Sequence, residues 1–147
     1  MFKAYEFVDK PTYEKLGDEA IKLMDTNLLL TVMEIRRILD MPMIINDWYF
    51  GKSFQQRGYR SPESNIGAPK SAHRLGKAVD FDAYLKGVRQ EPDKIREKII
   101  KNRTRLPYLA GLELGINWVH IDTMQRSGYE QGKILTFYPE AGKAKWI

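Results

Sequence analysis

The sequence predicts an α+β fold in which N-terminal helices pack on a small antiparallel sheet. Helical periodicity is found in residues 11–41, whereas residues 42–138 contain mainly short alternating segments that are typical of strands. Helices that come first, followed by strands with short connections, favour this class. A length of 147 residues fits one domain. We therefore expect a single unit with a helical part at 11–41 and a core at 42–138.

Two helices are expected in the N-terminal part and one later in the chain. The first begins at Pro11, because proline is favoured in the first turn of a helix. Asp25 or Thr26 is the expected N-cap of the second helix, and Pro42 ends it. The third helix is expected over residues 92–102 and has a basic exposed face.

The strands are identified by alternating apolar and polar residues. Asp80 and Asp82 fall on one side of their strand, with Val79 and Phe81 on the other. Residues 47–70 form a loop rich in Gly, Ser, Pro, Arg and Gln, and a loop of that length is usually functional. A Gly-Ile-Asn turn indicates a hairpin. The expected strands cover residues 43–46, 77–83, 110–114, 118–122 and 134–138.

Composition limits the chemistry available to this chain. Cysteine is absent, which excludes disulfides, thiolate metal ligands and cysteine nucleophiles. The only histidines are His73 and His120. The net charge of +5 is typical either of a protein with an anionic partner or of one with a mildly basic surface. The basic run from Lys94 to Arg105 carries no nucleic-acid motif, so we expect no nucleic-acid partner.

No segment of the chain has the pattern of a targeting or membrane sequence. Residues 1–10 mix charged and aromatic side chains without an apolar run, unlike a signal peptide. The longest apolar cluster, residues 28–33, is too short to cross a bilayer. We therefore expect cytoplasmic synthesis and no membrane insertion, and the residues leave the oligomeric state open.

Three residues have the chemistry and spacing of a catalytic metal site. Such a zinc site takes three nitrogen or oxygen ligands from the protein and leaves a fourth position for water. His73, Asp80 and His120 supply two imidazoles and one carboxylate. Gly76 permits a turn between the loop of His73 and the strand of Asp80, and His120 comes from the neighbouring hairpin. Zn²⁺ is therefore the expected cofactor.

Asp80 is the most informative of the three. An unpaired carboxylate in the apolar strand Ala-Val-Asp-Phe would cost several kcal/mol, so a cation must lie near it. That cation is either a metal ion or one of the arginines. Each histidine, taken alone, also fits an ordinary core or surface residue. The combination of all three with Gly76 favours the metal.

Segments around these residues resemble the motifs of a known family. Residues 71–80 resemble the Ser-x-His-x-x-Gly-x-Ala-x-Asp signature of the zinc D-Ala-D-Ala carboxypeptidase and L-alanyl-D-glutamate endopeptidase family, and residues 118–122 resemble its Trp-x-His-x-Asp element. Residues 58–61 are similar to its upstream Ser-Gly-Tyr-Arg-Ser stretch, with Arg57 in place of the first serine. The resemblance covers about residues 40–123 and implies the fold that this family shares with the hedgehog signalling domain.

The resemblance implies a role for one residue outside the ligand set, and position in the sequence suggests roles for three others. Arg60 matches the arginine with which the family stabilises an oxyanion or holds substrate. Ser71 is expected to brace the loop of the first ligand. Asp122 lies two residues after His120, so it points to the same face and is expected to orient the imidazole or the substrate. Tyr59 flanks the long loop and either lines a peptide groove or belongs to an aromatic core.

The general base is the least certain of the expected roles. Several members of the family place a glutamate three residues before the last histidine ligand, where this chain has Asn117. If Ile116 and Asn117 form a two-residue turn, Glu113 lies directly across from His120 at about 5 Å between Cβ atoms. Its carboxylate then either accepts a proton from the water on the zinc or only orients His120. The Glu-x-Gly-x-x-Trp-x-His pattern resembles the phage-type branch of the family.

The leading functional hypothesis is a zinc metallopeptidase that hydrolyses amide bonds in peptidoglycan stem peptides, as a D-Ala-D-Ala carboxypeptidase or an L-Ala-D-Glu type endopeptidase. A basic surface would assist its approach to the anionic cell wall. Synthesis without a signal peptide fits a phage lysis enzyme that acts after release, by analogy. The alternative is a zinc-binding module that has lost catalysis and acts as a binding or virion component.

Overall fold

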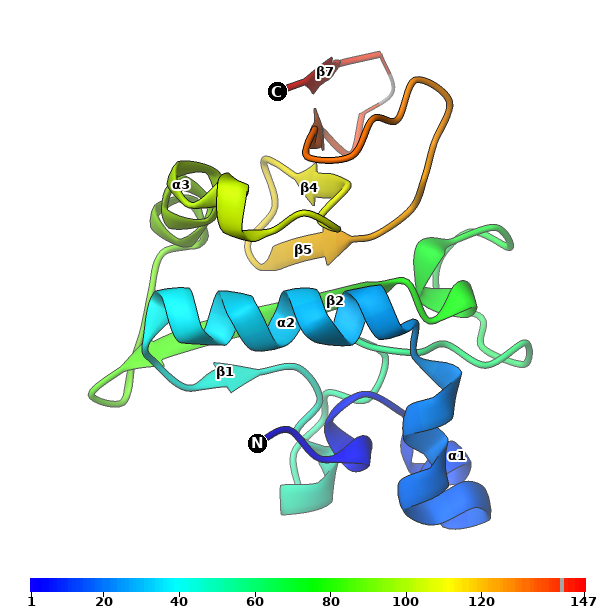
Figure 1. The fold of residues 1–147 in the computed structure, drawn as a ribbon. Coiled ribbons are helices and arrows are strands. Elements are labelled where there is room, and N and C mark those ends of the chain that lie inside the picture. The colour runs from blue at the N-terminus through cyan, green and yellow to red at the C-terminus, as the bar shows by residue number, and fades with distance from the viewer. Residues whose placement is uncertain (141) are drawn as a thin grey trace.

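A computed structural model describes residues 1–140 and 142–147. In this part of the chain, three α-helices accompany a mixed sheet of seven strands (Figure 1). The predicted α+β class is therefore confirmed. None of the helices in the described residues is long and apolar enough to span a bilayer.

The helices follow the predicted caps, with one break. The predicted first helix divides into α1 (Lys10–Leu16) and a 3₁₀ helix (Gly17–Leu23), because Gly17 adopts a positive φ of 57°. Asp25 caps α2 (Thr26–Leu39) by accepting a hydrogen bond from the backbone N–H of Leu28. The third helix, α3 (Pro92–Lys101), begins at its proline as predicted.

The sheet contains the predicted strands and two short ones that the alternation pattern did not reveal. Its order is β1-β2-β5-β4-β6-β7, and β3 pairs with the end of β2. The unpredicted strands are β3 and β7. The bounds are β1 (Met43–Ile44), β2 (Ala78–Leu85), β3 (Val88–Arg89), β4 (Gly111–Glu113), β5 (Val119–Asp122), β6 (Leu135–Phe137) and β7 (Ala144–Trp146).

The expectation of a purely antiparallel sheet is wrong, because β6 pairs with β4 in parallel. The reason lies in the pairing of β5, whose two edges are already occupied by β2 and β4. The next strand, β6, therefore cannot pair with β5 and instead lies beyond β4. Since β4 and β6 both run opposite to β5, they run parallel to each other.

Alternation along the central strands separates an apolar face from a polar face of the sheet. Helix α2 packs against α3, and α3 packs against β5 (Figure 1). The strands direct apolar side chains into the core that these helices share, including Val79, Phe81, Leu112, Val119 and Ile121. Because successive side chains of a strand point to opposite faces, the other face carries Asp80, Asp82, Glu113, His120 and Asp122.

The predicted loop at residues 47–70 is irregular apart from a 3₁₀ helix (Trp48–Phe50). Beside β2, the loop takes the place of β1 beyond the point where β1 ends. There the backbone N–H of Asp80 donates to the carbonyl of Arg57 at 2.7 Å. Further along the loop, the backbone N–H of Tyr59 donates to the carbonyl of Phe7 at 2.7 Å. The loop is thereby held next to the polar face of the sheet.

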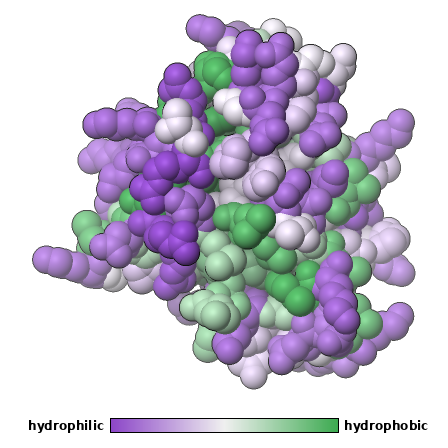
Figure 2. Space-filling model, viewed as in Figure 1, coloured by the Kyte–Doolittle hydropathy of each residue, from purple (hydrophilic) through white to green (hydrophobic). Residues whose placement is uncertain are grey.

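The surface of α2 that faces away from the sheet is partly apolar. Leu30 and Met33 are each 48% exposed. Figure 2 shows apolar side chains gathered over this helix and the N-terminal segment, within a surface that is otherwise mainly hydrophilic. This surface by itself indicates no particular function.

A substitution of Gly76 tests whether the turn between the 3₁₀ helix of His73 and β2 requires glycine. Its φ is +66°, and a Cβ would collide with the backbone carbonyl of Leu23. We expect Gly76→Ala to lower the free energy of unfolding by about 2 kcal/mol or more, measured by urea denaturation followed by circular dichroism. Gly132→Ala is the matched control, because Gly132 also has a positive φ but open space around it. Equal losses in the two variants would contradict the steric argument.

Candidate metal centre

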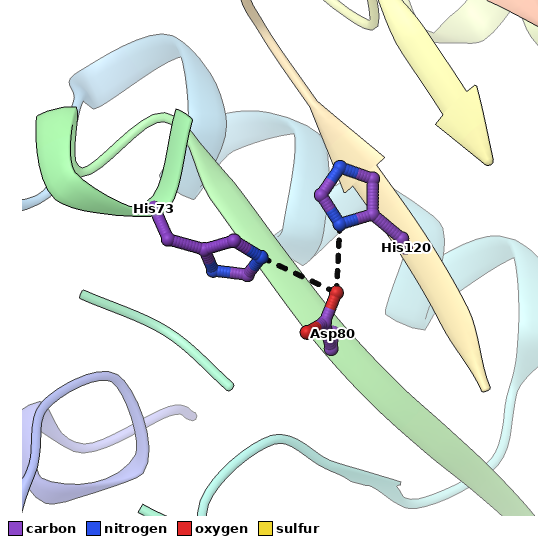
Figure 3. A group of neighbouring side chains, drawn as sticks. All are labelled: His73, Asp80 and His120. Atoms are coloured by element: carbon purple, nitrogen blue, oxygen red, sulfur yellow. Dashed lines mark hydrogen bonds and ion pairs between the residues drawn. The ribbon is translucent and has the colours of Figure 1, made fainter. Parts of the chain in front are cut away.

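His73, Asp80 and His120 come together on the polar face of the sheet (Figure 3). His73 lies in a 3₁₀ helix (Ala72–Leu75), Asp80 in β2 and His120 in β5. The Oδ1 atom of Asp80 is 3.4 Å from Nε2 of His73 and 2.7 Å from Nδ1 of His120. One ligand atom from each residue lies within 4.8 Å of the others, and all three residues are buried. This group can hold a metal ion.

The two strand residues of the group face each other directly. Asp80 and His120 are partners in the antiparallel ladder of β2 and β5, so the backbone fixes their separation. His73 is held by the turn before β2, in which the Oγ of Ser71 accepts a hydrogen bond from the backbone N–H of His73 at 3.3 Å. Rigid elements therefore position all three side chains.

The remaining nitrogen of each imidazole contacts an oxygen acceptor. Nδ1 of His73 is 2.8 Å from the carbonyl oxygen of Gly58, and Nε2 of His120 is 3.3 Å from Oδ2 of Asp122. A neutral imidazole that donates from one nitrogen has its lone pair on the other. The two lone pairs then lie on Nε2 of His73 and Nδ1 of His120, the atoms that face Asp80. The donor set therefore fits a metal cation.

Two glycines allow these contacts. At Gly58 a side chain would collide with the backbone of Phe7, and at Gly111, which pairs with Asp122 across the ladder, it would collide with the Asp122 carboxylate. Neither glycine was identified as part of the site from the sequence. Gly58 lies in the Gly-Tyr-Arg-Ser segment, and that motif is the signal that could have indicated it.

Arg126 is a further residue that sequence reasoning missed. Its Nη1 and Nη2 atoms donate to Oδ1 and Oδ2 of Asp122, both at 2.7 Å. The backbone N–H of Met124 adds a hydrogen bond to Oδ1 at 3.0 Å. Asp122 is fully buried, so this bidentate pair compensates its charge and fixes the carboxylate against His120.

Opposite charges stabilise one another within this group. Burial disfavours the charged form of His120, but hydrogen bonds to Asp122 and Asp80 prevail and raise its pKa to about 10. Burial likewise opposes the ionisation of Asp80, yet hydrogen bonds from His120 and His73 hold its pKa well below the usual range. Despite its burial, Asp122 has a pKa lowered to about 2 by His120 and Arg126. Two carboxylates thus stabilise positive charge between them.

An arginine was the alternative to a metal ion as the cation near Asp80, and it contacts only one of the two carboxylate oxygens. Arg60 places Nη2 3.4 Å from Oδ2 of Asp80, and its Nε donates to the carbonyl of Gln56 at 2.8 Å. The second oxygen, Oδ1, faces both histidines. The structure therefore brings Arg60 to the edge of the group and leaves Oδ1 directed at the imidazoles.

Glu113 lies where the hairpin register predicted it, opposite His120 in the ladder of β4 and β5. The ladder ends at this pair, so the connection spans residues 114–118. Burial raises the pKa of the half-buried Glu113 carboxyl. The side-chain oxygen of Asn117 instead accepts from Nη1 of Arg89 at 3.3 Å. Glu113 therefore lies beside the metal group, whereas Asn117 is bound to Arg89.

The aromatic residues of the long loop divide between partly buried and exposed positions. Tyr59 packs against the hydrophobic core, and Trp48 donates to the carbonyl of Val8 at 2.8 Å. Tyr49 stacks on Tyr5 with ring centroids 4.0 Å apart. A cavity of about 340 Å³ does lie beside the metal group, and its lining includes Phe54, Arg57, Arg60, Ile66, Asp80 and Trp118. We call this cavity the groove.

The contact between Asp122 and His120 predicts an effect on metal affinity. Removal of the acceptor in Asp122→Ala leaves the His120 ring without its oriented partner, and we expect Zn²⁺ binding to weaken by roughly 10- to 100-fold. Isothermal titration calorimetry measures the dissociation constant. Glu130→Ala, which removes an exposed carboxylate on the loop after β5, is the control. An unchanged dissociation constant in Asp122→Ala would refute the orienting role.

The raised pKa of His120 predicts that metal binding releases a proton. Because this pKa is about 10 without metal, His120 is protonated at pH values below it and must lose that proton to become a ligand. Titration calorimetry at about pH 8, in buffers of different ionisation enthalpy, should show at least about one proton released per ion, because ionisation of a zinc-bound water would add to the proton lost by His120. The number should fall as the pH rises through the pKa, and no release at about pH 8 would contradict the assignment of His120 as a ligand.

Comparisons with models of protein families, with curated proteins and with solved structures find no match to this chain.

Proposed function

We propose that this chain is a zinc-dependent peptidase that hydrolyses amide bonds in peptidoglycan stem peptides. The observation that carries the proposal is the buried group of two imidazoles and one carboxylate, with Glu113 directly across the ladder from His120. A ligand set of this size and type leaves a coordination position open for catalysis, whereas structural zinc sites are closed by four protein ligands.

The donor atoms support zinc as the metal. Imidazole nitrogens combined with one carboxylate oxygen are typical of catalytic zinc, whereas magnesium and calcium prefer sites built from oxygen. When bound, zinc supplies Lewis acidity, which polarises the scissile carbonyl and makes water a stronger acid. The Asp80 carboxylate contributes the negative charge that holds the cation in a buried site.

Glu113 is the proposed general base. Its backbone is fixed by the ladder and by Arg96, whose Nε donates to the Glu113 carbonyl at 2.9 Å. A partly buried carboxyl with a raised pKa is a better proton acceptor than an exposed one. Glu113 would take a proton from the attacking water and pass it to the leaving amine.

Arg60 is proposed to stabilise the negative charge that develops on the carbonyl oxygen. Its guanidinium lines the groove and lies beside Asp80. Burial lowers the pKa of Arg60, but a guanidinium remains charged at neutral pH. Preorganised donors of this kind stabilise an oxyanion more than the neutral carbonyl.

The substrate class rests on the resemblance of the site segments to the zinc D-Ala-D-Ala and L-Ala-D-Glu peptidase family. The Ser-x-His-x-x-Gly-x-Ala-x-Asp and Trp-x-His-x-Asp patterns contain all three residues of the metal group. On the same resemblance, we propose a fold like that of the hedgehog signalling domain. Cleavage would be of the carboxypeptidase or the endopeptidase type. The protein would be a phage-type enzyme that reaches the cell wall after release. The net charge of +5 favours approach to an anionic wall.

A catalytically inactive zinc-binding module is the second candidate. The observation that favours it is Asn117, which occupies the position of the family's glutamate and cannot accept a proton. Arg89 holds Asn117 at both its side-chain and its backbone oxygen. In this alternative, Glu113 would only influence the His120 ring, and the protein would serve as a binding or virion component.

A variant of Glu113 separates the two candidates. With zinc bound, the wild-type protein is expected to release fragments from purified peptidoglycan, and Glu113→Gln should lower the rate by at least about 100-fold while zinc content is unchanged. Product analysis by mass spectrometry and metal analysis provide the two measurements. Glu97→Gln, on the exposed face of α3, is the control. Full zinc content without wild-type cleavage of any wall substrate would favour the module.

A further inference from the structure

The groove beside the metal group combines aromatic rings with guanidinium groups. Phe54 and Trp118 are 39% and 38% exposed and line the groove together with Arg57 and Arg60. Exposed aromatic rings next to fixed cations are suited to a ligand that has both apolar and anionic parts. Arg60 already lies against Asp80, whereas Arg57 has no role in the site as described above.

Arg57 is held firmly in place at the groove. Its guanidinium carbon lies 3.8 Å from the centre of the Phe54 ring, and Nη1 donates to Oδ2 of Asp82 at 2.8 Å. The Arg57 side chain is only 13% exposed. The backbone is also fixed, because its N–H donates to the side-chain oxygen of Asn46 at 3.0 Å. A cation positioned in this way loses little further conformational freedom when it binds a ligand.

The charge of Arg57 is only partly balanced. Asp82 also accepts hydrogen bonds from Nε and Nη2 of Arg89, at 3.0 and 2.6 Å, through its other oxygen. Two guanidinium groups therefore share one carboxylate, and one positive charge remains. Within the described residues, the Arg57 side chain has the single hydrogen bond to Asp82, which leaves its Nε and Nη2 donors for a ligand.

We propose that Arg57 is a specificity-determining residue that binds a free carboxylate of the substrate near the scissile amide bond. The inference rests on the proposed function, because it deepens the assignment of the same site. The planar guanidinium matches a carboxylate in two parallel hydrogen bonds. Phe54 and Trp118 contact the apolar part of the same ligand. The carboxylate is either the C-terminus of the peptide or an acidic side chain next to the bond.

Paired peptides that differ only in charge test this proposal. One pair is acetyl-lysyl-D-alanyl-D-alanine and its C-terminal amide, and the other contains an internal D-glutamate or D-glutamine beside the scissile bond. The zinc-loaded wild-type protein should prefer the acid in one pair by roughly 10- to 100-fold in kcat/KM, as expected for a hydrogen-bonded charge pair. The pair that shows the preference identifies the source of the carboxylate. Equal rates within both pairs would overturn the proposal.

Variants of Arg57 connect the preference to this residue. Arg57→Gln keeps planar donors but removes the charge, so KM for the preferred acid should rise roughly 10-fold or more with kcat nearly unchanged. Arg57→Lys should recover part of the preference, because it restores the charge without the planar geometry. The exposed Arg103→Gln is the control. A preference for the acid that survives in Arg57→Gln would overturn the proposal.

Binding separates this proposal from the proposed catalysis. If no peptide is cleaved, the peptidase assignment fails, and the affinities of the same acid and amide peptides are measured by isothermal titration calorimetry with wild-type protein and Arg57→Gln. Tighter binding of an acid than of its amide by the wild type, lost in the variant, would support Arg57 as a carboxylate site without catalysis. Equal affinities for acid and amide would overturn it.

Discussion

The burial of the Asp80 carboxylate is the constraint on which the rest of the structure depends. A carboxylate removed from water costs several kcal/mol unless cations and hydrogen-bond donors compensate it. Here two imidazoles approach one oxygen and Arg60 approaches the other. The hairpin of β4 and β5, the turn before β2 and the long loop each deliver one of these groups. Each of these elements therefore has a defined place around a single side chain.

The division of the sheet into two faces makes this burial possible. Helices α2 and α3 and the apolar side chains of the strands form the core on one side, so the other side can carry charge without disrupting it. The charges of residues on that side compensate one another. Asp122 pairs with Arg126, and Asp82 is shared by Arg57 and Arg89. In the described residues, no buried side-chain nitrogen or oxygen lacks a hydrogen-bond partner. The site is thus a satisfied polar layer above an apolar core.

This layer explains how the same residues would serve catalysis. The histidine nitrogens that do not face Asp80 are bound to Gly58 and Asp122, so little reorganisation would be needed for a cation to replace the proton on His120. Glu113 lies outside the metal group but beside it, which suits a group that transfers protons rather than binds metal. Arg60 and Arg57 make the groove positive, and this favours both an oxyanion and an anionic substrate.

The sequence by itself determined the features that depend on local chemistry. Caps and turn residues located α2 and the turn at Gly76, and alternation with the hairpin turn predicted that Glu113 would face His120. The three residues of the metal group were predicted because histidine is scarce in this chain and Asp80 lies in an apolar strand. Such features follow from periods and spacings of a few residues.

Only the tertiary structure decided the contacts that depend on the path of the loops. The edges of β5 are occupied by β2 and β4, and β6 pairs in parallel with β4, which no local pattern encodes. The carbonyl of Gly58 reaches His73, and Arg126 binds Asp122, because loops without periodicity return to the polar face. The groove position of Arg57 depends in the same way on long-range packing, in which residues distant in the chain compensate one another's buried charge.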